Sequence, residues 1–448
     1  MKSIKVGILG AGSFARAFVP LFKAHPQVRG VSIAELIPER RKSEAAAAGI
    51  AETYGSLDEL LASDCDAVAI FTQRWMHAQQ AIAALKAGKH VYSTVPAAMT
   101  VEDMGELVET VKRTGLTYML GETSYYYPST IFCREMWRQG KFGRFVYGEG
   151  EYMHDMSHGF YEAYQYSGGA DWKKTAGVPP MLYPTHTMSM IVSVTGAHMT
   201  RVSCFGQVDG SGDGIFGKGL NKWDNAFSNE TALFRTSDGG SARINELRRV
   251  GHWGGRSVRL SLFGTEGCFE EQPEGDVWVN RAREITPLND LLRCSPVDPV
   301  NGGAKPQDGT QHDFHSGMAP VHPAWRLPKE LAVLPTGHHG SHLFLVDDFI
   351  RACTTGSLPP NHVWAAARYN IPGIIAQSPR SATASSWPCL TSASPRPAPR
   401  GSRSCSPSWR RPTSPGPSPS PPTSANPGGE PGTPSTAPCR PIPPSPPV

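Results

Sequence analysis

The 448-residue sequence lacks the cysteine pairs that staple small secreted domains or hold zinc. Its nine cysteines are scattered from Cys65 to Cys439, and no two of them form a C-x-x-C pair. This pattern indicates reduced thiols, and therefore a cytoplasmic protein without a disulfide framework or a zinc site. The first residues also show no signal-peptide architecture, which agrees with a cytoplasmic location.

Long apolar runs and a strong charge excess are missing too. No apolar segment is long enough to span a bilayer, so we expect no membrane partner. The net charge is only +4, part of it comes from arginines near the C-terminus, and we therefore expect no nucleic-acid partner. With 39% hydrophobic residues the chain can bury sizeable cores, and two domains are the natural number.

Residues 377–448 lack lysine, aspartate, histidine, methionine, phenylalanine and tyrosine altogether. They are mainly serine, proline, arginine, alanine and glycine, a composition that cannot bury enough apolar surface to fold. We therefore expect a disordered tail. Its abrupt start after ARYNIPGIIA is also typical of a GC-rich gene translated out of frame, so a frameshift is a second interpretation of these residues.

The first third of the chain has the pattern of a dinucleotide-binding domain. A strand expected at residues 5–10 runs into the motif GAGSFA, which opens a helix that should reach about Ala24. In this G-x-G-x-x-A motif Gly10 permits a tight turn, Gly12 lets a pyrophosphate approach the backbone, and Ala15 lets the helix pack closely on the strand. The helix N-terminus would face the phosphates.

The second expected strand, residues 31–34, ends in Glu35. This is about the spacing of an acid that binds the adenosine ribose in such domains. A carboxylate there accepts a hydrogen bond from the 2′-hydroxyl and repels a 2′-phosphate, which favours NAD. Arg40 and Arg41 follow closely and are suited to a 2′-phosphate, so NADP is the alternative.

Strands and helices then alternate. Strands are expected at 66–72, 90–93 and 117–121, and helices at 77–87 and 101–113. This order predicts a Rossmann domain with a doubly wound parallel sheet over residues 1–123, in which ligands bind beyond the carboxyl ends of the strands. The residues at those ends are Glu35, Thr72, Thr94, Val95, Pro96 and Glu122. For Glu122 a surface position and a site position are both open.

The middle of the chain is rich in strands. After a helix near 128–139, strands are expected at 144–156, 201–208, 230–236, 241–246 and 257–263. They predict an α+β domain over residues 124–376 with an open, mostly antiparallel sheet, whose face can join subunits of a homo-oligomer. Residues 294–336 are expected to form a long loop near the substrate. Helices at 343–353 and 363–369 are expected to pack back on the first domain.

The segment Tyr183-Pro184-Thr185-His186 carries the strongest local signal of this second region. Proline suits the first helical position, apolar residues then recur at helical spacing, and Gly196 supplies a stop. His186 is therefore expected in the first turn, where the helix N-terminus disfavours imidazolium and keeps the ring neutral. The alternative is a structural Tyr–His pair in a core, whose polar groups bond only to each other and have no catalytic role.

A second histidine cluster, His338-His339 with His342, has His312 and His315 nearby in the sequence. A metal site and contacts to sugar hydroxyls are both interpretations of it. No acidic or cysteine partner stands at ligand spacing, so we expect no metal.

Several of these segments together resemble one known family. GILGAGSFARAF, AELIPERR, FTQRWMHAQQAIAALKAGKHV and ARYNIPGIIA are similar to the glucose–fructose oxidoreductase, inositol dehydrogenase and rhizopine-catabolism (Gfo/Idh/MocA) family over roughly residues 1–376. The resemblance implies a Rossmann domain followed by an open-sheet domain, dimers or tetramers, and sugar or cyclitol substrates.

The chain departs from the family's dehydrogenases at two places. They carry Glu-Lys-Pro where this sequence has Thr94-Val95-Pro96, and valine cannot move a proton. The dehydrogenases also carry an Asp-x-x-x-His motif. This sequence has Leu182 in place of that aspartate and keeps only the histidine, His186. A dehydrogenase that loses such groups typically loses about 10²–10⁴-fold in rate.

The same substitutions resemble the NAD-dependent glycosidases of glycoside hydrolase family 109. That subgroup is similar in its valine-proline loop, a glutamate at the position of Glu122, a tyrosine at that of Tyr152, and the Tyr-Pro-Thr-His of Tyr183 and His186. The resemblance implies transient oxidation of a sugar at C3, removal of the C2 proton by Tyr152, and elimination. Tyr183 and His186 would serve the C3 hydroxyl, and Glu122 would assist protonation of the leaving group or water.

The substrate is expected to be a small carbohydrate. Strand-end positions and resemblance together predict NAD contacts at Gly10, Gly12, Ser13, Phe14, Ala15, Glu35, Arg40, Thr72, His77, Thr94, Val95, Pro96 and Glu122. A conventional sugar dehydrogenase and an inactive cofactor- or sugar-binding homologue are the alternative functions.

Overall fold

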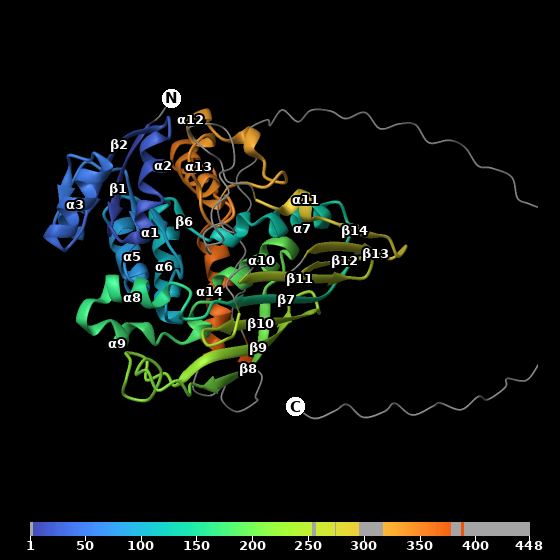
Figure 1. Cartoon of the computed structure of the whole chain (residues 1–448). Coiled ribbons are helices and arrows are strands. Elements are labelled where there is room, and N and C mark those ends of the chain that lie inside the picture. Colours follow the sequence, from blue (N-terminus) through green and yellow to red (C-terminus); the bar gives the residue numbers. More distant parts are fainter. Residues whose placement is uncertain (1–2, 253–256, 274, 295–316, 378–386, 389–448) are drawn as a thin grey trace, which may run out of the picture. The chain divides into compact units, whose positions relative to one another are not determined.

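The computed structural model describes residues 3–252, 257–273, 275–294, 317–377 and 387–388, all within one compact unit of residues 1–395. Figure 1 shows its two sheets with helices between and around them. Apart from Gln377 and residues 387–388, the predicted tail 377–448 lies outside the described residues. The predicted limits of the two domains stay predictions.

The first sheet is parallel throughout, with the strand order β3-β2-β1-β4-β5-β6. Its strands are β1 (Ile4–Leu9), β2 (Val28–Ala34), β3 (Thr53–Tyr54), β4 (Ala67–Ile70), β5 (His90–Ser93) and β6 (Tyr118–Leu120). The helices between them are α1 (Ser13–Arg16), α2 (Val19–Ala24), α3 (Pro38–Ala48), α4 (Leu57–Leu61), α5 (His77–Lys86) and α6 (Val101–Thr114). The order reverses between β1 and β4, and this point places a ligand crevice at the carboxyl ends of those strands. The predicted doubly wound parallel sheet is confirmed.

Burial on both faces explains why β4 reads as a continuous apolar run. Val68 and Ile70 join one core cluster, whereas Ala67 and Ala69 join the other, on the opposite face. Strands of a parallel sheet that helices cover on both sides lose the polar alternation of half-exposed strands.

The prediction of one helix from the glycine motif to Ala24 is wrong, because the helix is interrupted between Arg16 and Val19. Pro20 lies in the first turn of α2 and has no N–H to donate to the carbonyl of Arg16, so the chain restarts there. The amides of Ala17 and Phe18 donate instead to Phe14 and Ala15, three residues back.

The second sheet has the order β14-β13-β12-β11-β7-β10-β9-β8-β15. Its strands are β7 (Phe145–Met153), β8 (Met199–Val208), β9 (Phe227–Thr236), β10 (Ser241–Leu247), β11 (Val258–Gly264), β12 (Gly267–Glu271), β13 (Asp276–Asn280), β14 (Ile285–Pro287) and β15 (Trp387–Pro388). All neighbours pair antiparallel except β10 and β7, which run parallel. The predicted open, mostly antiparallel sheet is confirmed.

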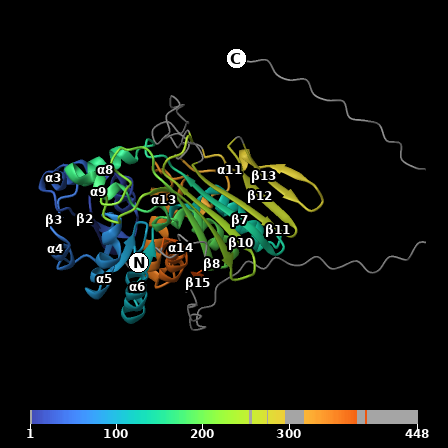
Figure 2. The same ribbon diagram turned by 90° about the horizontal axis from the view of Figure 1, so that it is seen from below.

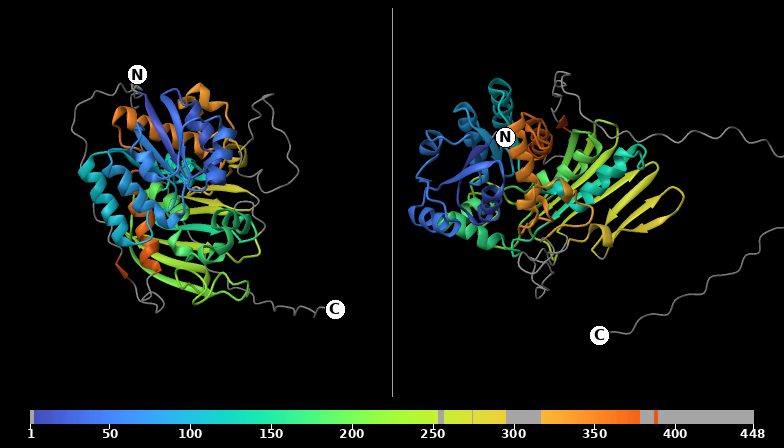
Figure 3. Two further views of the ribbon diagram at one scale, coloured as in Figure 1. Left: turned by 90° about the vertical axis from the view of Figure 1, so that its left-hand side faces the viewer. Right: turned by 90° about the horizontal axis from the view of Figure 1, so that it is seen from above.

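Among the residues that the structure describes, helices cover one face of this second sheet and leave the other open. The helices α7 (Pro128–Arg138), α10 (Thr185–Thr195) and α14 (Val363–Ala376) pack on that face or on one another, and Figures 2 and 3 show the sheet as a layer beside them. On β7 the covered face carries Gly148, Gly150 and Tyr152, whereas Val146 on the other face is 49% exposed. Phe205 and Leu233 are exposed on β8 and β9 as well.

Helix α10 lies at the centre of the second domain. Its residues 185–192 are all buried, more than the helical spacing of its apolar residues predicts, because the helix packs against β7, α7 and α14 at once. Pro184 precedes the helix as its N-cap instead of occupying the first turn, while Gly196 ends it in a left-handed conformation, as expected. The hydroxyl of Thr187 lies within hydrogen-bond distance of the carbonyl of Pro184 and of the carboxylate of Glu246.

The C-terminal helices return to the first sheet. Helix α13 (Ser341–Thr355) joins the core cluster that contains Ile4, Val6 and Ile8, and α14 packs on α6 and β6 as well as on α10. The expected structureless loop at 294–336 is wrong for its described part, 317–336, which holds η6 (Ala324–Arg326) and α12 (Lys329–Ala332). Leu331 of α12 is fully buried, and its packing against the core holds this segment in place. Residues 295–316 lie outside the described residues.

No helix among the described residues is long and apolar enough to cross a membrane. The six cysteines within those residues are all free, as the sequence predicts.

Two buried glutamates face each other on neighbouring strands beneath α10. Glu246 of β10 is the cross-strand partner of Glu230 of β9, and both are shielded from solvent. Burial raises the pKa of each carboxyl to about 7, although the positive charge of Arg248 lowers the pKa of both. Glu230 also accepts a hydrogen bond of 2.6 Å from the amide of Met181.

The substitution Glu230→Gln should remove a pH-dependent loss of stability. A carboxyl whose pKa rises on folding contributes stability below its ordinary pKa of 4.5 and loses it as the pH rises to about 7. Glutamine stays neutral, so the stability of the variant relative to the parent should increase over this window, by about 1.4 kcal/mol per pH unit. Melting curves from pH 4 to 8 measure this, with the half-exposed Glu270→Gln as the control; a constant difference would contradict it.

Candidate active site

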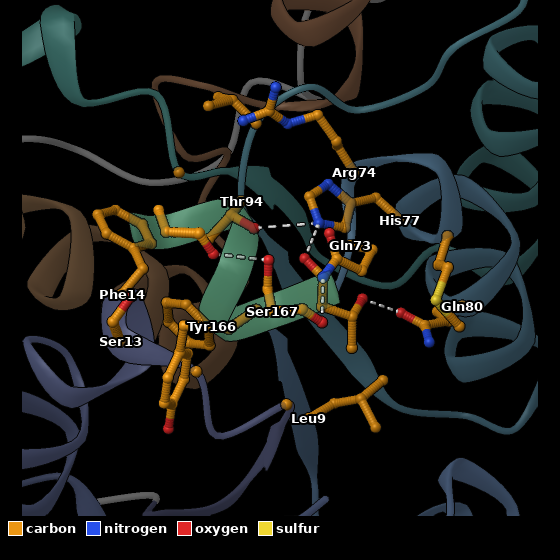
Figure 4. Close-up of a pocket in the computed structure, with 18 of the residues that line it drawn as sticks. Leu9, Ser13, Phe14, Gln73, Arg74, His77, Gln80, Thr94, Tyr166 and Ser167 are labelled. Atoms are coloured by element: carbon orange, nitrogen blue, oxygen red, sulfur yellow. Dashed lines mark hydrogen bonds between the residues drawn. The ribbon is translucent and has the colours of Figure 1, made fainter. Parts of the chain in front are cut away.

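A cavity of about 930 Å³ opens at the carboxyl ends of the first sheet, where the strand order reverses. The second domain supplies its other walls through the end of β7, the start of α10 and the helix α8 (Phe160–Gly168). Most of the predicted site residues line it: Gly10, Gly12, Ser13, Phe14, Glu35, Arg40, Thr72, His77, Thr94, Val95, Tyr152, Tyr183 and His186. In Figure 4, Phe14 and Tyr166 lie on one side of the cavity, and His77 and Gln80 lie on the opposite side.

The glycine motif forms a turn that accepts a diphosphate. Gly10 has φ +88°, and a Cβ there would stand 3.1 Å from the carbonyl group of Phe71, so only glycine fits. A Cβ on Gly12 would meet nothing within 4 Å, which means that this residue borders the open cavity. Ala15 does not line the cavity and is buried behind the turn, which suits its expected packing role. The residues present therefore fit a dinucleotide.

Glu35 is the residue that holds this turn in place. Its Oε2 accepts a hydrogen bond of 2.9 Å from the amide of Ala11, and its Oε1 accepts one of 3.0 Å from the amide of Ile37. Arg40 approaches the same carboxylate to 4.0 Å. A carboxylate oxygen has more than one acceptor site, so Glu35 remains able to receive a ribose hydroxyl while it bridges two loops.

His77 ties together the loops that follow β4 and β5. Its Nδ1 lies 2.9 Å from the carbonyl of Pro96, and its Nε2 lies 3.0 Å from the carbonyl of Thr72 and 3.3 Å from the hydroxyl of Thr94 (Figure 4). Burial lowers the pKa of His77, and a neutral ring can donate to only one of these carbonyls. Val95 lines the cavity, but Pro96, which follows a cis peptide bond, does not.

The chemistry of the site centres on a histidine and a glutamate from different domains. The Nδ1 of His186 lies 2.6 Å from Oε1 of Glu122, which also accepts hydrogen bonds from the amide and hydroxyl of Ser124. Burial opposes ionisation of Glu122, but the nearby His186 and these hydrogen bonds outweigh it and lower the pKa of the carboxyl. His186 lines the cavity, and Nε2 is the ring nitrogen that it offers there.

The position of Glu122 corrects two expectations. This glutamate is fully buried and does not line the cavity, because His186 stands between it and the open space. It therefore contacts neither a cofactor nor a substrate in this arrangement. In a neutral His186 ring the hydrogen bond to Glu122 places the proton on Nδ1.

Two tyrosines complete the wall around His186. The ring centroids of Tyr152 and Tyr183 are each 5.4 Å from that of His186 and 6.1 Å from each other. Burial raises the pKa of Tyr152 well above its ordinary value and that of Tyr183 to about 12. The guanidinium of Arg74, 4.5 Å from the Tyr183 ring, acts in the opposite direction on Tyr183.

Helix α8 supplies residues that sequence reasoning missed. Arg74 donates a hydrogen bond of 2.6 Å to the hydroxyl of Tyr164, and Gln73 donates one of 3.3 Å to the carbonyl of Ser167. Arg40 stacks 4.5 Å from the ring of Tyr166 and donates to its carbonyl at 3.0 Å. Each contact joins the first domain to α8 across the cavity. The aromatic-rich segment FYEAYQY is the one signal that could have indicated a ligand-facing helix.

The second histidine cluster packs on the glycine motif. His338 lines the cavity, and its Nδ1 lies 3.0 Å from Nε2 of His342, whose pKa burial lowers to about 3. The ring of Phe14 meets both histidines edge-on. Among the described residues no group of three potential ligands could hold a metal. His312 and His315 lie outside those residues.

Comparison with known proteins finds a family whose model matches the first sheet and its helices. Residues 4–122 match the model of the Gfo/Idh/MocA proteins, described as an oxidoreductase family with an NAD-binding Rossmann fold. Over these residues the chain is similar to the NAD-binding domain of the Gfo/Idh/MocA oxidoreductases. The expectations of an NAD-dependent enzyme and of NAD as its cofactor are thereby confirmed.

Several similar proteins carry the name glycosyl hydrolase family 109 protein. A glycosyl hydrolase family 109 protein of Solibacter usitatus is 23% identical over 390 residues, which cover 84% of this chain and 85% of that protein. Another, of Saccharopolyspora erythraea, is 28% identical over 300 residues, or 61% of this chain and 63% of its own. A third, of Shewanella amazonensis, is 30% identical, but the match covers only 44% of that protein and 43% of this chain.

Solved structures share the fold at lower sequence identity. Levoglucosan dehydrogenase in complex with NADH and levoglucosan has a TM-score of 0.63 at 18% identity, covering 87% of this chain and all of that one. Scyllo-inositol dehydrogenase from Lactobacillus casei, with bound NAD(H) and scyllo-inositol, has a TM-score of 0.59 at 16% identity, covering 83% and 95%. Identities this low show a common architecture only.

The substitution Glu35→Ala should weaken NAD binding and reduce discrimination against NADP. It removes the hydrogen bonds to the amide of Ala11 in the glycine turn and to the amide of Ile37 in the loop after β2, together with the negative charge that opposes a 2′-phosphate. Calorimetric titration with NAD⁺ and NADP⁺ measures both effects, and we expect the NAD affinity to fall about tenfold, the equivalent of about 1.4 kcal/mol. The exposed Glu39→Ala on α3 is the control. Equal affinities of parent and variant for both nucleotides would contradict the assignment.

Proposed function

We propose that the protein is an NAD-dependent glycosidase that breaks a glycosidic bond through transient oxidation of the sugar at C3. The observation that carries the proposal is the composition of the cavity wall: Val95 stands where the resembling dehydrogenases carry lysine, while Tyr152, Tyr183 and His186 converge nearby. The similarity to glycosyl hydrolase family 109 proteins over most of the chain supports it.

His186, Tyr183 and Glu122 would serve the oxidation at C3. When bound, NAD⁺ supplies the acceptor for a hydride from C3 and the donor that returns it. His186 takes the proton of the C3 hydroxyl at Nε2, and Glu122 holds the ring in the tautomer that leaves this nitrogen basic. Tyr183, in ring contact with His186, orients the same hydroxyl.

The elimination step falls to Tyr152. A C3 ketone acidifies the C2 hydrogen; the C2–H bond breaks, its proton passes to the deprotonated oxygen of Tyr152, and the electron pair forms a C1–C2 double bond as the glycosidic oxygen leaves C1 and takes a proton from water. Water then adds to C1, the proton returns to C2, and the ketone is reduced. Because Glu122 is buried behind His186, we assign it to positioning His186 and not to protonating the leaving group.

Solvent deuterium at C2 tests this route. Turnover in deuterated water should place deuterium at C2 of the released sugar, whereas direct displacement by a carboxylate pair leaves C2 untouched. Tyr152→Phe keeps the ring packing and removes the hydroxyl, so aglycone release should fall by about 10²–10⁴-fold. Mass spectrometry of the sugar released from nitrophenyl glycosides, among them N-acetylgalactosaminides as suggested by a 28% identical relative in Shewanella oneidensis, reads the label.

Three results would contradict this function. Unlabelled C2 in the released sugar would exclude the elimination. Net formation of NADH from free sugars without aglycone release would indicate the alternative, a sugar dehydrogenase. Tight NAD binding without either activity would indicate a silent binding protein.

We further propose that the open face of the second sheet joins two copies of the chain. Val146, Phe205 and Leu233 are 49%, 63% and 55% exposed on this face, which no helix among the described residues covers. Phe205→Glu should therefore shift the molecule toward the monomer in analytical ultracentrifugation, while Leu358→Glu, an exposed leucine beyond α13, should not. A parent protein that sediments as a monomer would contradict the proposal.

A further inference from the structure

One charged pair beneath the cavity has no part in the reaction as described so far. Arg248 follows β10 and is only 6% exposed, and its Nη2 donates a hydrogen bond of 3.0 Å to Oε2 of Glu246, which is fully buried. The other oxygen of Glu246 accepts a hydrogen bond of 2.9 Å from the hydroxyl of Thr187, the residue after His186. Burial and the hydrogen bond to Glu246 therefore hold the guanidinium of Arg248 in one position.

Strand register aims this arginine at Tyr152. Glu246 is the direct partner of Tyr152 across the parallel β10–β7 pair, and residues two apart on a strand face the same side, so Arg248 continues the row. Its guanidinium lies 4.7 Å from the centroid of the Tyr152 ring and 5.7 Å from that of Phe160. A cation at this distance is attracted to the ring, and more strongly where water is excluded.

The surroundings of Tyr152 otherwise disfavour its ionised form. Burial and Tyr183 raise its pKa, with smaller contributions in the same direction from Tyr127 and Glu246. His154 and His186 face the ring at 5.4 Å. Arg248 is the cation in contact with this ring that opposes burial. A tyrosine that must accept a proton from carbon needs such a neighbour.

We propose that Arg248, held by Glu246, is the positioning residue of Tyr152: it fixes the phenol at the cavity wall and stabilises its deprotonated form. This rests on the proposed function, in which the C2–H bond breaks, the proton joins the Tyr152 oxygen, and the electron pair expels the C1 oxygen. Arg248 touches none of the reacting atoms and acts through the phenol alone.

Arg248→Met and Arg248→Lys, each in the full chain loaded with NAD⁺, test the proposal. Stopped-flow absorbance of NADH follows oxidation at C3, and solvent deuterium at C2 follows the Tyr152 step. For Arg248→Met we expect oxidation within about twofold of the parent and C2 exchange slower by about 10²-fold. The rise of the exchange rate with pH should move to higher pH, because a phenol without its cation is harder to ionise. Lysine, which keeps the charge, should recover most of the loss.

The matched control is Arg243→Met, on the same strand but on the open face, where Arg243 pairs with Glu149 at 2.9 Å. It should leave both steps unchanged. Since Arg248→Met leaves Glu246 without its cation, the double variant Arg248→Met/Glu246→Gln, neutral at both positions, provides the same comparison if the single variant fails to fold.

Two results would overturn the proposal while leaving the glycosidase function intact. One is C2 exchange at the parent rate and pH dependence in the methionine variants. The other is an equal loss of oxidation and exchange together with a lower melting temperature, which would indicate a structural role. A parent enzyme that shows neither cofactor reduction nor C2 exchange would overturn the function itself and this proposal with it.

Discussion

The hydrogen bond between His186 and Glu122 is the interaction on which the site depends. It joins a helix N-terminus of the second domain to the end of β6 in the first, at 2.6 Å and almost entirely out of water. Ser124 strengthens the junction, because its hydroxyl lies within hydrogen-bond distance of Glu122, the carbonyl of His186 and the hydroxyl of Ser189. This contact thus links β6 to α10 and determines which nitrogen His186 presents to the cavity.

The two sheets have complementary tasks around this junction. The parallel sheet brings the glycine turn, Glu35 and the His77 network to one edge, where a dinucleotide fits. The mixed sheet carries Tyr152 at the end of β7 and supports it from the neighbouring strand through Glu246 and Arg248. Helix α8 then closes the gap through contacts with Arg40, Gln73 and Arg74. The cavity therefore combines a redox cofactor site with groups suited to moving protons.

Sequence reasoning reached the parts that local chemistry determines. The glycine motif, the β/α alternation and the proline–histidine helix start each follow from short-range rules, and the structure brings these segments to one cavity. It failed where a distant partner decides: α10 is buried all round because three elements surround it, and Glu122 faces away from the cavity because His186 covers it. Arg248 and α8 were missed for the same reason, since only strand register and domain packing reveal them.

The central claim is that the cofactor takes a hydride from C3 and returns it to the same sugar. A glycoside deuterated at C3 tests this most directly when it is hydrolysed in the presence of excess unlabelled NADH. If the hydride returns to the sugar that released it, the released sugar keeps its deuterium at C3 and no deuterated NADH appears in solution. Loss of the C3 label to solution NADH would contradict it and would indicate a dehydrogenase that exchanges its cofactor at every turnover.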